Sequence, residues 1–263
     1  TFTVYPNIQG DTVSLYHERI NCLLLTDDQV LWLGTGAGLI KFDIEKESMT
    51  PYLSTPQEYF SSRSNYILDI CEDDNNNLWI GTTYGLIIFN PENGRSTRYY
   101  HTPGDPTGLS NDNIRCIIRE NSGKLWIGTR NGLNYYDTTT RKIKQYFYQP
   151  DDPNSIGSNY IRTIYEDRQG TIWLGTEAGG LNRYNREKDH FIRYTHTGSD
   201  KNSLSNNRVY SVFEDRTGNL WVGTYKGVNK INKYTNDFRL FQQGQHGLNS
   251  NFIWGFDQDR AGN

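Results

Sequence analysis

The sequence has little cysteine, almost no methionine and no long apolar run. Its three cysteines, Cys22, Cys71 and Cys116, form no Cys-x-x-Cys pair and cannot all pair with one another. A disulfide framework or a zinc site therefore has little support, and we interpret the three side chains as buried apolar thiols. No stretch approaches the roughly 18–20 apolar residues that a membrane-spanning helix requires.

The sequence also lacks a strong charge of one sign and a targeting segment. Lys and Arg number 27 against 30 Asp and Glu, which gives a formal net charge of −3. No field large enough to concentrate nucleic acid or anionic lipid is expected, so nucleic-acid binding is excluded as a leading function. The first ten residues lack the basic and apolar regions of a signal peptide. We expect any targeting or anchoring segment, and hence any contact with a membrane, to lie outside this chain.

Chemical motifs are scarce. The five histidines show no metal-ligand spacing, and His101 and His196 occupy matching repeat positions, which favours a structural role. No nucleophile elbow, Walker loop or dinucleotide fingerprint is present. We therefore predict no catalytic residue, no metal site and no cofactor.

An internal repeat dominates the sequence. The tetrapeptide Trp-x-Gly-Thr occurs five times, with the tryptophans at Trp32, Trp79, Trp126, Trp173 and Trp221. The successive spacings are 47, 47, 47 and 48 residues. Much of the aromatic content of 14% is thus periodic.

Other residue types recur around each tryptophan. Twelve residues before it stands an aliphatic residue: Ile20, Ile67, Ile114, Ile161 and Val209. Six residues before it there is usually an acid: Asp73, Glu120, Asp167 and Asp215. The first copy departs from this pattern, with Thr26 in the place of the acid.

One repeat reads as four short strands. In the fourth copy, the apolar run IRTIYED ends in the turn DRQG, where Asp can bond the backbone and Gly can supply a positive φ. The second strand, TIWLGT, is rich in β-branched and aromatic residues. Two further strands, GLNRY and HFIRYT, follow after turns. Four strands in about 40–50 residues are typical of a propeller blade, whereas the units of a parallel solenoid are usually shorter. We predict an all-β chain that forms a β-propeller of four-stranded antiparallel blades.

The repeat closely resembles that of a known family. The segment SLSNNRVYSVFEDRTGNLWVGTYKGVNKIN at 203–232 is similar to the two-component regulator propeller repeat. That repeat builds the periplasmic sensor region of hybrid two-component systems, typical of Bacteroides, which sense breakdown products of complex polysaccharides. The resemblance implies a periplasmic ligand-sensing domain of an inner-membrane sensor that regulates polysaccharide utilisation genes. The histidine kinase, the membrane helix and the homodimer contacts would then lie outside this chain, and the domain itself would not be an enzyme.

The repeat also predicts the domain organisation. We expect a single, partial propeller over 1–263, with an initial strand at about 2–5 and five complete blades that belong to a seven-bladed ring. A fragment of a longer sensor, completed by its remaining blades or by a second propeller, is expected. The expected blades lie at 17–55, 64–102, 111–149, 158–197 and 206–242, and the start of a further blade lies at 250–263.

Candidate ligand-binding residues are those that vary where the repeat would otherwise be constant. In a propeller, the loops that enter the inner strands and the loops between second and third strands lie at one mouth of the channel. Arginines and aromatic residues alternate there, and we call the following set the mouth residues: Arg19, Tyr66, Tyr84, Arg115, Arg130, Tyr160, Arg162, Glu177, Arg208, Tyr210, Tyr225, Lys226 and Trp254. Repeat-locked Leu109, Ile156, Leu204 and Leu248 in the same loops are expected to be structural anchors.

These residue types suit an oligosaccharide that is acidic or partly acidic. Arginine offers a planar donor fork for carboxylate or sulfate, and aromatic faces stack on sugar rings. The alternative for each arginine is a structural ion pair with an acid. Two other functions stay open: a propeller glycoside hydrolase or lyase, for which only Glu177 is an obvious carboxylate, and a protein-interaction scaffold.

Overall fold

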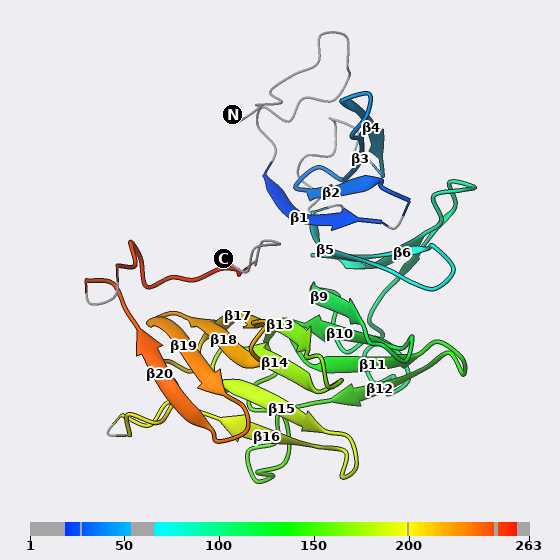
Figure 1. Cartoon of the computed structure of the whole chain (residues 1–263). Helices are drawn as coiled ribbons and strands as arrows, with labels where there is room; N and C mark the ends of the chain where they lie inside the picture. Colours follow the sequence, from blue (N-terminus) through cyan, green and yellow to red (C-terminus); the bar gives the residue numbers. More distant parts are fainter. Residues whose placement is uncertain (1–18, 27, 54–65, 199, 245–246, 257–263) are drawn as a thin grey trace. The chain divides into compact units, whose positions relative to one another are not determined.

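The structure of this chain is all β. It is a computed structural model that describes residues 19–26, 28–53, 66–198, 200–244 and 247–256. Across these ranges the strands form five four-stranded sheets, and no helix occurs among them. In every sheet the strands follow the chain order and successive strands are antiparallel, as Figure 1 shows. The predicted propeller of four-stranded antiparallel blades is confirmed, whereas the expected strand at 2–5 lies outside the described residues.

Each sheet takes its four strands from one copy of the repeat. The strands are β1 (Ile20–Leu25), β2 (Leu31–Thr35), β3 (Leu39–Asp43) and β4 (Ser48–Tyr52) in the first sheet; β5 (Ile67–Glu72), β6 (Leu78–Thr82), β7 (Gly85–Phe89) and β8 (Ser96–Tyr99) in the second; β9 (Ile114–Arg119), β10 (Leu125–Thr129), β11 (Leu133–Asp137) and β12 (Lys142–Tyr146) in the third; β13 (Ile161–Glu166), β14 (Ile172–Thr176), β15 (Leu181–Asn185) and β16 (His190–Tyr194) in the fourth; and β17 (Val209–Glu214), β18 (Asn219–Thr224), β19 (Gly227–Asn232) and β20 (Asp237–Phe241) in the fifth.

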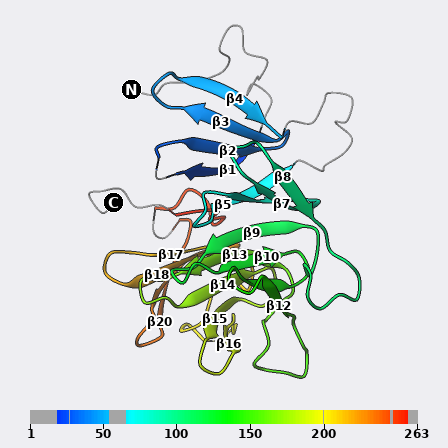
Figure 2. The same cartoon turned by 90° about the vertical axis from the view of Figure 1, so that its right-hand side faces the viewer.

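The chain divides into two compact units, Thr1–Arg119 and Glu120–Asn263. Figure 2 shows β1 to β4 of the first unit side by side in chain order. The blade limits and the membership of a seven-bladed ring stay predictions.

The threonine and the following glycine of each copy build the turn between the second and third strands. In the fourth sheet the Thr176 hydroxyl donates to the carbonyl of Gly180 at 3.0 Å, and every other copy repeats this bond. Gly180 has a φ of +71°, and a Cβ there would lie 2.1 Å from the carbonyl oxygen of Tyr194. Only glycine fits this turn, which explains the recurring Gly-Leu or Gly-Val step.

In four of the five copies, the acid six residues before the tryptophan accepts the indole N–H. The Asp73 Oδ2 to Trp79 Nε1 distance is 2.9 Å, and the same bond joins Glu120 to Trp126, Asp167 to Trp173 and Asp215 to Trp221. The aspartates also accept backbone N–H groups of the hairpin, as predicted for the turn. Each acid therefore fixes the indole ring and closes the hairpin.

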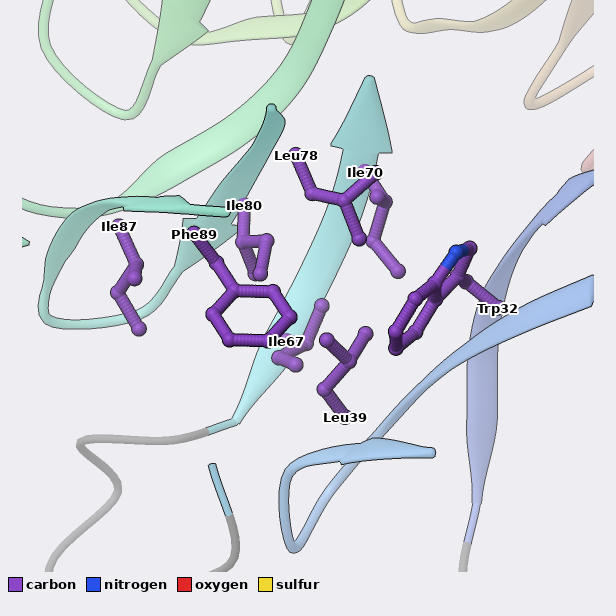
Figure 3. Packing of buried hydrophobic residues seen from close by; sticks show 8 residues of the cluster. All are labelled: Trp32, Leu39, Ile67, Ile70, Leu78, Ile80, Ile87 and Phe89. Atoms are coloured by element: carbon purple, nitrogen blue, oxygen red, sulfur yellow. The ribbon is translucent and has the colours of Figure 1, made fainter. Parts of the chain in front are cut away.

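The glycine of Trp-x-Gly-Thr brings successive sheets of one unit close together. A Cβ on Gly34 would lie 2.6 Å from Ile67, and one on Gly175 would lie 2.7 Å from Val209. Ile67 and Val209 are the recurring aliphatic residues of the next copy. Figure 3 shows the apolar cluster that results between the first two sheets, with Trp32 and Leu39 facing residues of β5 to β7.

The long loops that enter the inner strands are anchored as expected. Leu109, Ile156 and Leu204 are buried, and Leu248 is half-buried. The imidazole Nδ1 of His101 lies 2.6 Å from the Leu109 carbonyl, and His196 makes the same contact with Leu204. The structural interpretation of these residues is confirmed.

The three thiols are free. Cys116 is buried, whereas Cys22 and Cys71 are half-buried. Burial and the neighbouring Asp69 charge raise the pKa of Cys71 to about 12, and the same causes raise the pKa of Cys22. Both of these side chains are therefore neutral thiols near pH 7.

Candidate functional site

Backbone hydrogen bonds bring the two predicted sets of mouth residues together. The N–H of Glu177, just after β14, donates to the carbonyl of Tyr160, just before β13, at 3.0 Å. Tyr225 and Arg208 form the same bond at 3.1 Å in the fifth sheet. Side chains from the entry of the inner strand and from the end of the second strand therefore lie next to each other.

In the second unit three of the charged mouth residues, Arg162, Glu177 and Arg208, form one ion-paired cluster. The Glu177 carboxylate pairs with Arg162 of β13 and with Arg208, whose Nε lies 2.7 Å from Glu177 Oε1. A hydrogen bond to Tyr210 and the Glu177 charge raise the pKa of Arg208. The structural alternative thus holds for these two arginines, because both are engaged by an acid.

Aromatic rings flank this cluster on both sides. The Arg162 guanidinium lies 5.0 Å from the Tyr160 ring centroid and 4.8 Å from that of Tyr210. The other face of the cluster is formed by Tyr225, with the Arg208 guanidinium 5.2 Å from its centroid. Arg130 lies 6.0 Å from the Tyr160 ring and extends the row of cation–π contacts.

Two aromatic pairs continue from the cluster into solvent. The Tyr210 and Trp254 ring centroids are 4.5 Å apart, and those of Tyr225 and Phe252 are 4.6 Å apart. Trp254 is 68% exposed, an unusually high value for the largest apolar side chain. Phe252 is not among the mouth residues predicted from the sequence.

A shallow pocket opens beside the cluster. Its lining residues come from the same two loop sets: Glu177, Ala178, Asn206, Asn207, Arg208, Tyr225 and Lys226. Four cations against one acid, namely Arg130, Arg162, Arg208 and Lys226 against Glu177, leave the mouth residues of this unit with a formal charge of +3. The arrangement offers aromatic faces, fixed donors and a moderate positive charge.

The mouth residues of the first unit are less concentrated. Tyr66 donates from its hydroxyl to Asn21 at 3.5 Å, and Tyr84 packs edge-on against Tyr100 with centroids 5.3 Å apart. Arg19 is exposed just before β1, and Arg115 is half-buried in β9.

Sequence reasoning missed Asp69, an acid on the inner strand β5. Its carboxylate accepts the backbone N–H groups of Ile117 at 2.7 Å and of Ile70 at 3.0 Å. Burial raises the pKa of Asp69 to about 7, although these two hydrogen bonds act in the opposite direction. The other copies have Cys22, Cys116, Thr163 and Ser211 at this position. An acidic residue at a position where the other copies have small residues was the sequence signal that could have identified Asp69.

Asp69 is expected to make stability fall as the pH rises. An unfolded Asp titrates near pH 3.9, so between about pH 4 and 7 the folded chain holds a proton that the unfolded chain has lost. The free energy of unfolding should decrease through this window, by at most about 4 kcal/mol. Urea denaturation from pH 4 to 8 of the unmodified protein and Asp69→Asn isolates this contribution. A variant with the same pH dependence as the unmodified protein would contradict it.

Other classes of site find no support in the described part of the chain. No three His, Cys, Asp or Glu side chains gather as metal ligands within the described residues. None of the described residues forms a helix long and apolar enough to cross a membrane.

A family model identifies the repeat. The model described as two component regulator propeller matches residues 61–84, 108–131, 155–178 and 203–226. Each match contains the inner strand, the hairpin and the Trp-x-Gly-Thr strand of one copy. The fold thus defines a β-propeller repeat protein, and four of its five repeat copies match the two-component regulator propeller model. A search of curated proteins found no match.

Solved structures with a similar fold include sensor domains and an enzyme. One is the extracellular domain of a putative hybrid two-component system from B. thetaiotaomicron, with a TM-score of 0.75 and 22% identity. The match covers 93% of this chain and 31% of that chain. Another is virginiamycin B lyase from Staphylococcus aureus, with a TM-score of 0.60, 11% identity and coverage of 85% and 69%. A third is PorZ, a surface component of the type-IX secretion system of Porphyromonas gingivalis, with a TM-score of 0.63, 16% identity and coverage of 88% and 35%. At these identities the likeness shows the fold alone.

Proposed function

We propose that this chain is the ligand-sensing propeller of a hybrid two-component sensor histidine kinase, located in the periplasm, and that it binds a polysaccharide-derived oligosaccharide. Four matched repeats and a fold shared with an extracellular sensor domain support the sensor role. The match covers 31% of that domain. In this proposal the kinase, the membrane anchor and the dimer contacts lie in other parts of the sensor.

The observation that carries the ligand class is the pairing of Trp254 with Tyr210 beside the arginine cluster. Trp254 is 68% exposed, although burial of an indole is strongly favourable, and its neighbour Tyr210 contacts Arg162 on the protein side. An aromatic pair of this kind presents an apolar face for a sugar ring. Arg162 and Arg208 keep further N–H donors besides those that Glu177 accepts, so they can bind hydroxyl or carboxylate groups of the sugar.

Signal output would follow from the differential affinity of the ligand. An oligosaccharide can change kinase activity only if it binds one arrangement of the sensor dimer more tightly than another. The genes regulated in this way would be those for polysaccharide utilisation. The mouth cluster is the proposed input to that equilibrium.

Binding without turnover is the expected result that separates a sensor from an enzyme. We expect calorimetry to detect binding of tetragalacturonate, and weaker binding of neutral maltotetraose, because the mouth residues of the second unit carry a formal charge of +3. Chromatography of the same mixtures should show the unchanged oligosaccharides. Product formation would instead favour the hydrolase or lyase alternative. The absence of binding across a panel of plant, host and microbial oligosaccharides would favour a scaffold and overturn the proposal.

A further inference from the structure

A recurring ion pair fills the space between successive hairpins in the second unit. Lys233, just after β19, is 4% exposed and its Nζ lies 3.0 Å from Asp167 Oδ2 and 2.7 Å from Glu214 Oε1. One copy earlier, Arg186 occupies the equivalent position after β15 and pairs with Glu120 at 2.7 Å. In both places the acid that accepts the tryptophan N–H also holds a cation from the next sheet.

Both members of this ion pair are missing between the first two sheets. Thr26 stands at the position of the acid, and Pro91, just after β7, stands at the position of the cation. A pocket of about 200 Å³ lies there, and its lining includes Thr26, Trp32, Lys41, Glu72, Pro91 and Glu92. We call it the hairpin pocket. It lies on residues that contribute no proposed oligosaccharide contact.

Two hydrogen-bond donors, Trp32 and Lys41, line one wall of the hairpin pocket, and the acid that faces such donors in the other copies is missing there. In the fifth sheet Asp215 accepts the Trp221 N–H at 2.8 Å and lies 3.9 Å from the Nζ of Lys230. Trp32 pairs with Lys41 in the same strand register in which Trp221 pairs with Lys230.

The Trp32 indole N–H has no acceptor among the described residues, although the side chain is only 2% exposed. The Lys41 ammonium has no carboxylate within ion-pair distance in the same described part of the chain. Figure 3 shows the indole nitrogen at the edge of the Trp32 ring opposite Leu39. The nitrogen atom itself is not fully enclosed, so this donor is accessible from the hairpin pocket.

The rest of the pocket is acidic. Glu72 ends β5 at the position that Glu214 has in β17, and a Glu214 oxygen holds the Lys233 ammonium. Glu92 and Asp28 line the same space. Three acids against Lys41 give the lining a formal charge of −2.

We propose that the hairpin pocket binds a basic α-amino acid, with the chemistry of lysine or arginine. The ligand carboxylate replaces the missing acid and accepts hydrogen bonds from Trp32 Nε1 and the Lys41 ammonium. The ligand's cationic groups take the place that Lys233 and Arg186 fill elsewhere and pair with Glu92, with Glu72 and Asp28 in the same lining. A ligand that carries one carboxylate and two cations also matches the negative balance of the lining.

Calorimetric titration of the protein with L-lysine and L-arginine tests this site. We expect at least one of them to bind, and we expect norleucine, which lacks the side-chain cation, and 1,5-diaminopentane, which lacks the carboxylate, to bind at least tenfold more weakly. The absence of binding by both basic amino acids at 10 mM would overturn the proposal.

Two variants link that binding to this pocket. Thr26→Asp supplies the missing carboxylate internally, so it should raise the melting temperature and weaken binding of the basic amino acid at least tenfold. Glu92→Gln should weaken it to a similar extent through the other wall. Thr97→Asp, the same change at an exposed position on β8, serves as the matched control and should bind normally. Undiminished binding in both pocket variants would show that the amino acid binds elsewhere and would overturn the proposal.

Discussion

Replacement of Trp126 by alanine is expected to lower the free energy of unfolding by about 3–5 kcal/mol. The Trp126 side chain is fully buried, and its ring lies 4.4 Å from that of Tyr135 and 4.9 Å from that of Tyr184 in the next sheet. Its N–H donates to Glu120 at 3.0 Å. The substitution removes both the inter-sheet packing and one partner of a buried acid.

Urea denaturation followed by far-ultraviolet circular dichroism measures this loss. Trp254→Ala is the matched control, since it removes the same side chain from a position that is 68% exposed. We expect a change of less than about 0.5 kcal/mol in the control. A loss below 1 kcal/mol for Trp126→Ala would show that the repeated tryptophan does not hold the sheets together.

Replacement of Lys233 by methionine should destabilise the second unit by about 3–5 kcal/mol at neutral pH. Methionine keeps most of the side-chain volume, so the loss arises from the two buried acids, Asp167 and Glu214, that the lysine neutralises. Although burial opposes the charged form, hydrogen bonds to Glu214 and Asp167 raise the pKa of Lys233. The ammonium is therefore charged throughout the neutral range.

The pH dependence of this loss distinguishes charge from packing. Without the lysine, the two acids should bind protons more readily in the folded state, so the destabilisation should shrink as the pH falls toward 4. Lys188→Met, at an exposed position, is the control and should change stability little. A loss that is independent of pH would contradict the electrostatic account.

The fold could be predicted because its signals are local and repeated. The apolar run that begins at Ile161 became β13, and the Trp173 segment became β14, because alternation and turn residues act over a few positions. The role of Asp167 as a hairpin residue was predicted for the same reason. Its bonds to the Trp173 indole and to Lys233 were not, because they depend on side-chain geometry across and between sheets.

The residues of the candidate site could be predicted from the sequence, but the ion pairs between them could not. Residues that break the period pointed to Arg162, Glu177 and Arg208, since the two loop sets of a blade end at the same edge. That one glutamate engages both arginines follows from the distance between the fourth and fifth sheets, which the sequence does not contain. Thr26, which replaces the repeated acid, was a sequence signal for the hairpin pocket. Its interpretation also required Pro91, which lies outside the motif compared between the copies.

We propose that the residues that recur in every repeat stabilise the fold, whereas the residues that differ between repeats bind the ligand. Titration of tetragalacturonate into Trp254→Ala and into the unmodified protein, with the unfolding midpoint measured on the same samples, tests this claim most directly. We predict an affinity loss of at least tenfold, about 1.4 kcal/mol, with an unchanged midpoint. Equal affinity of the two proteins, or a loss that accompanies unfolding, would contradict it.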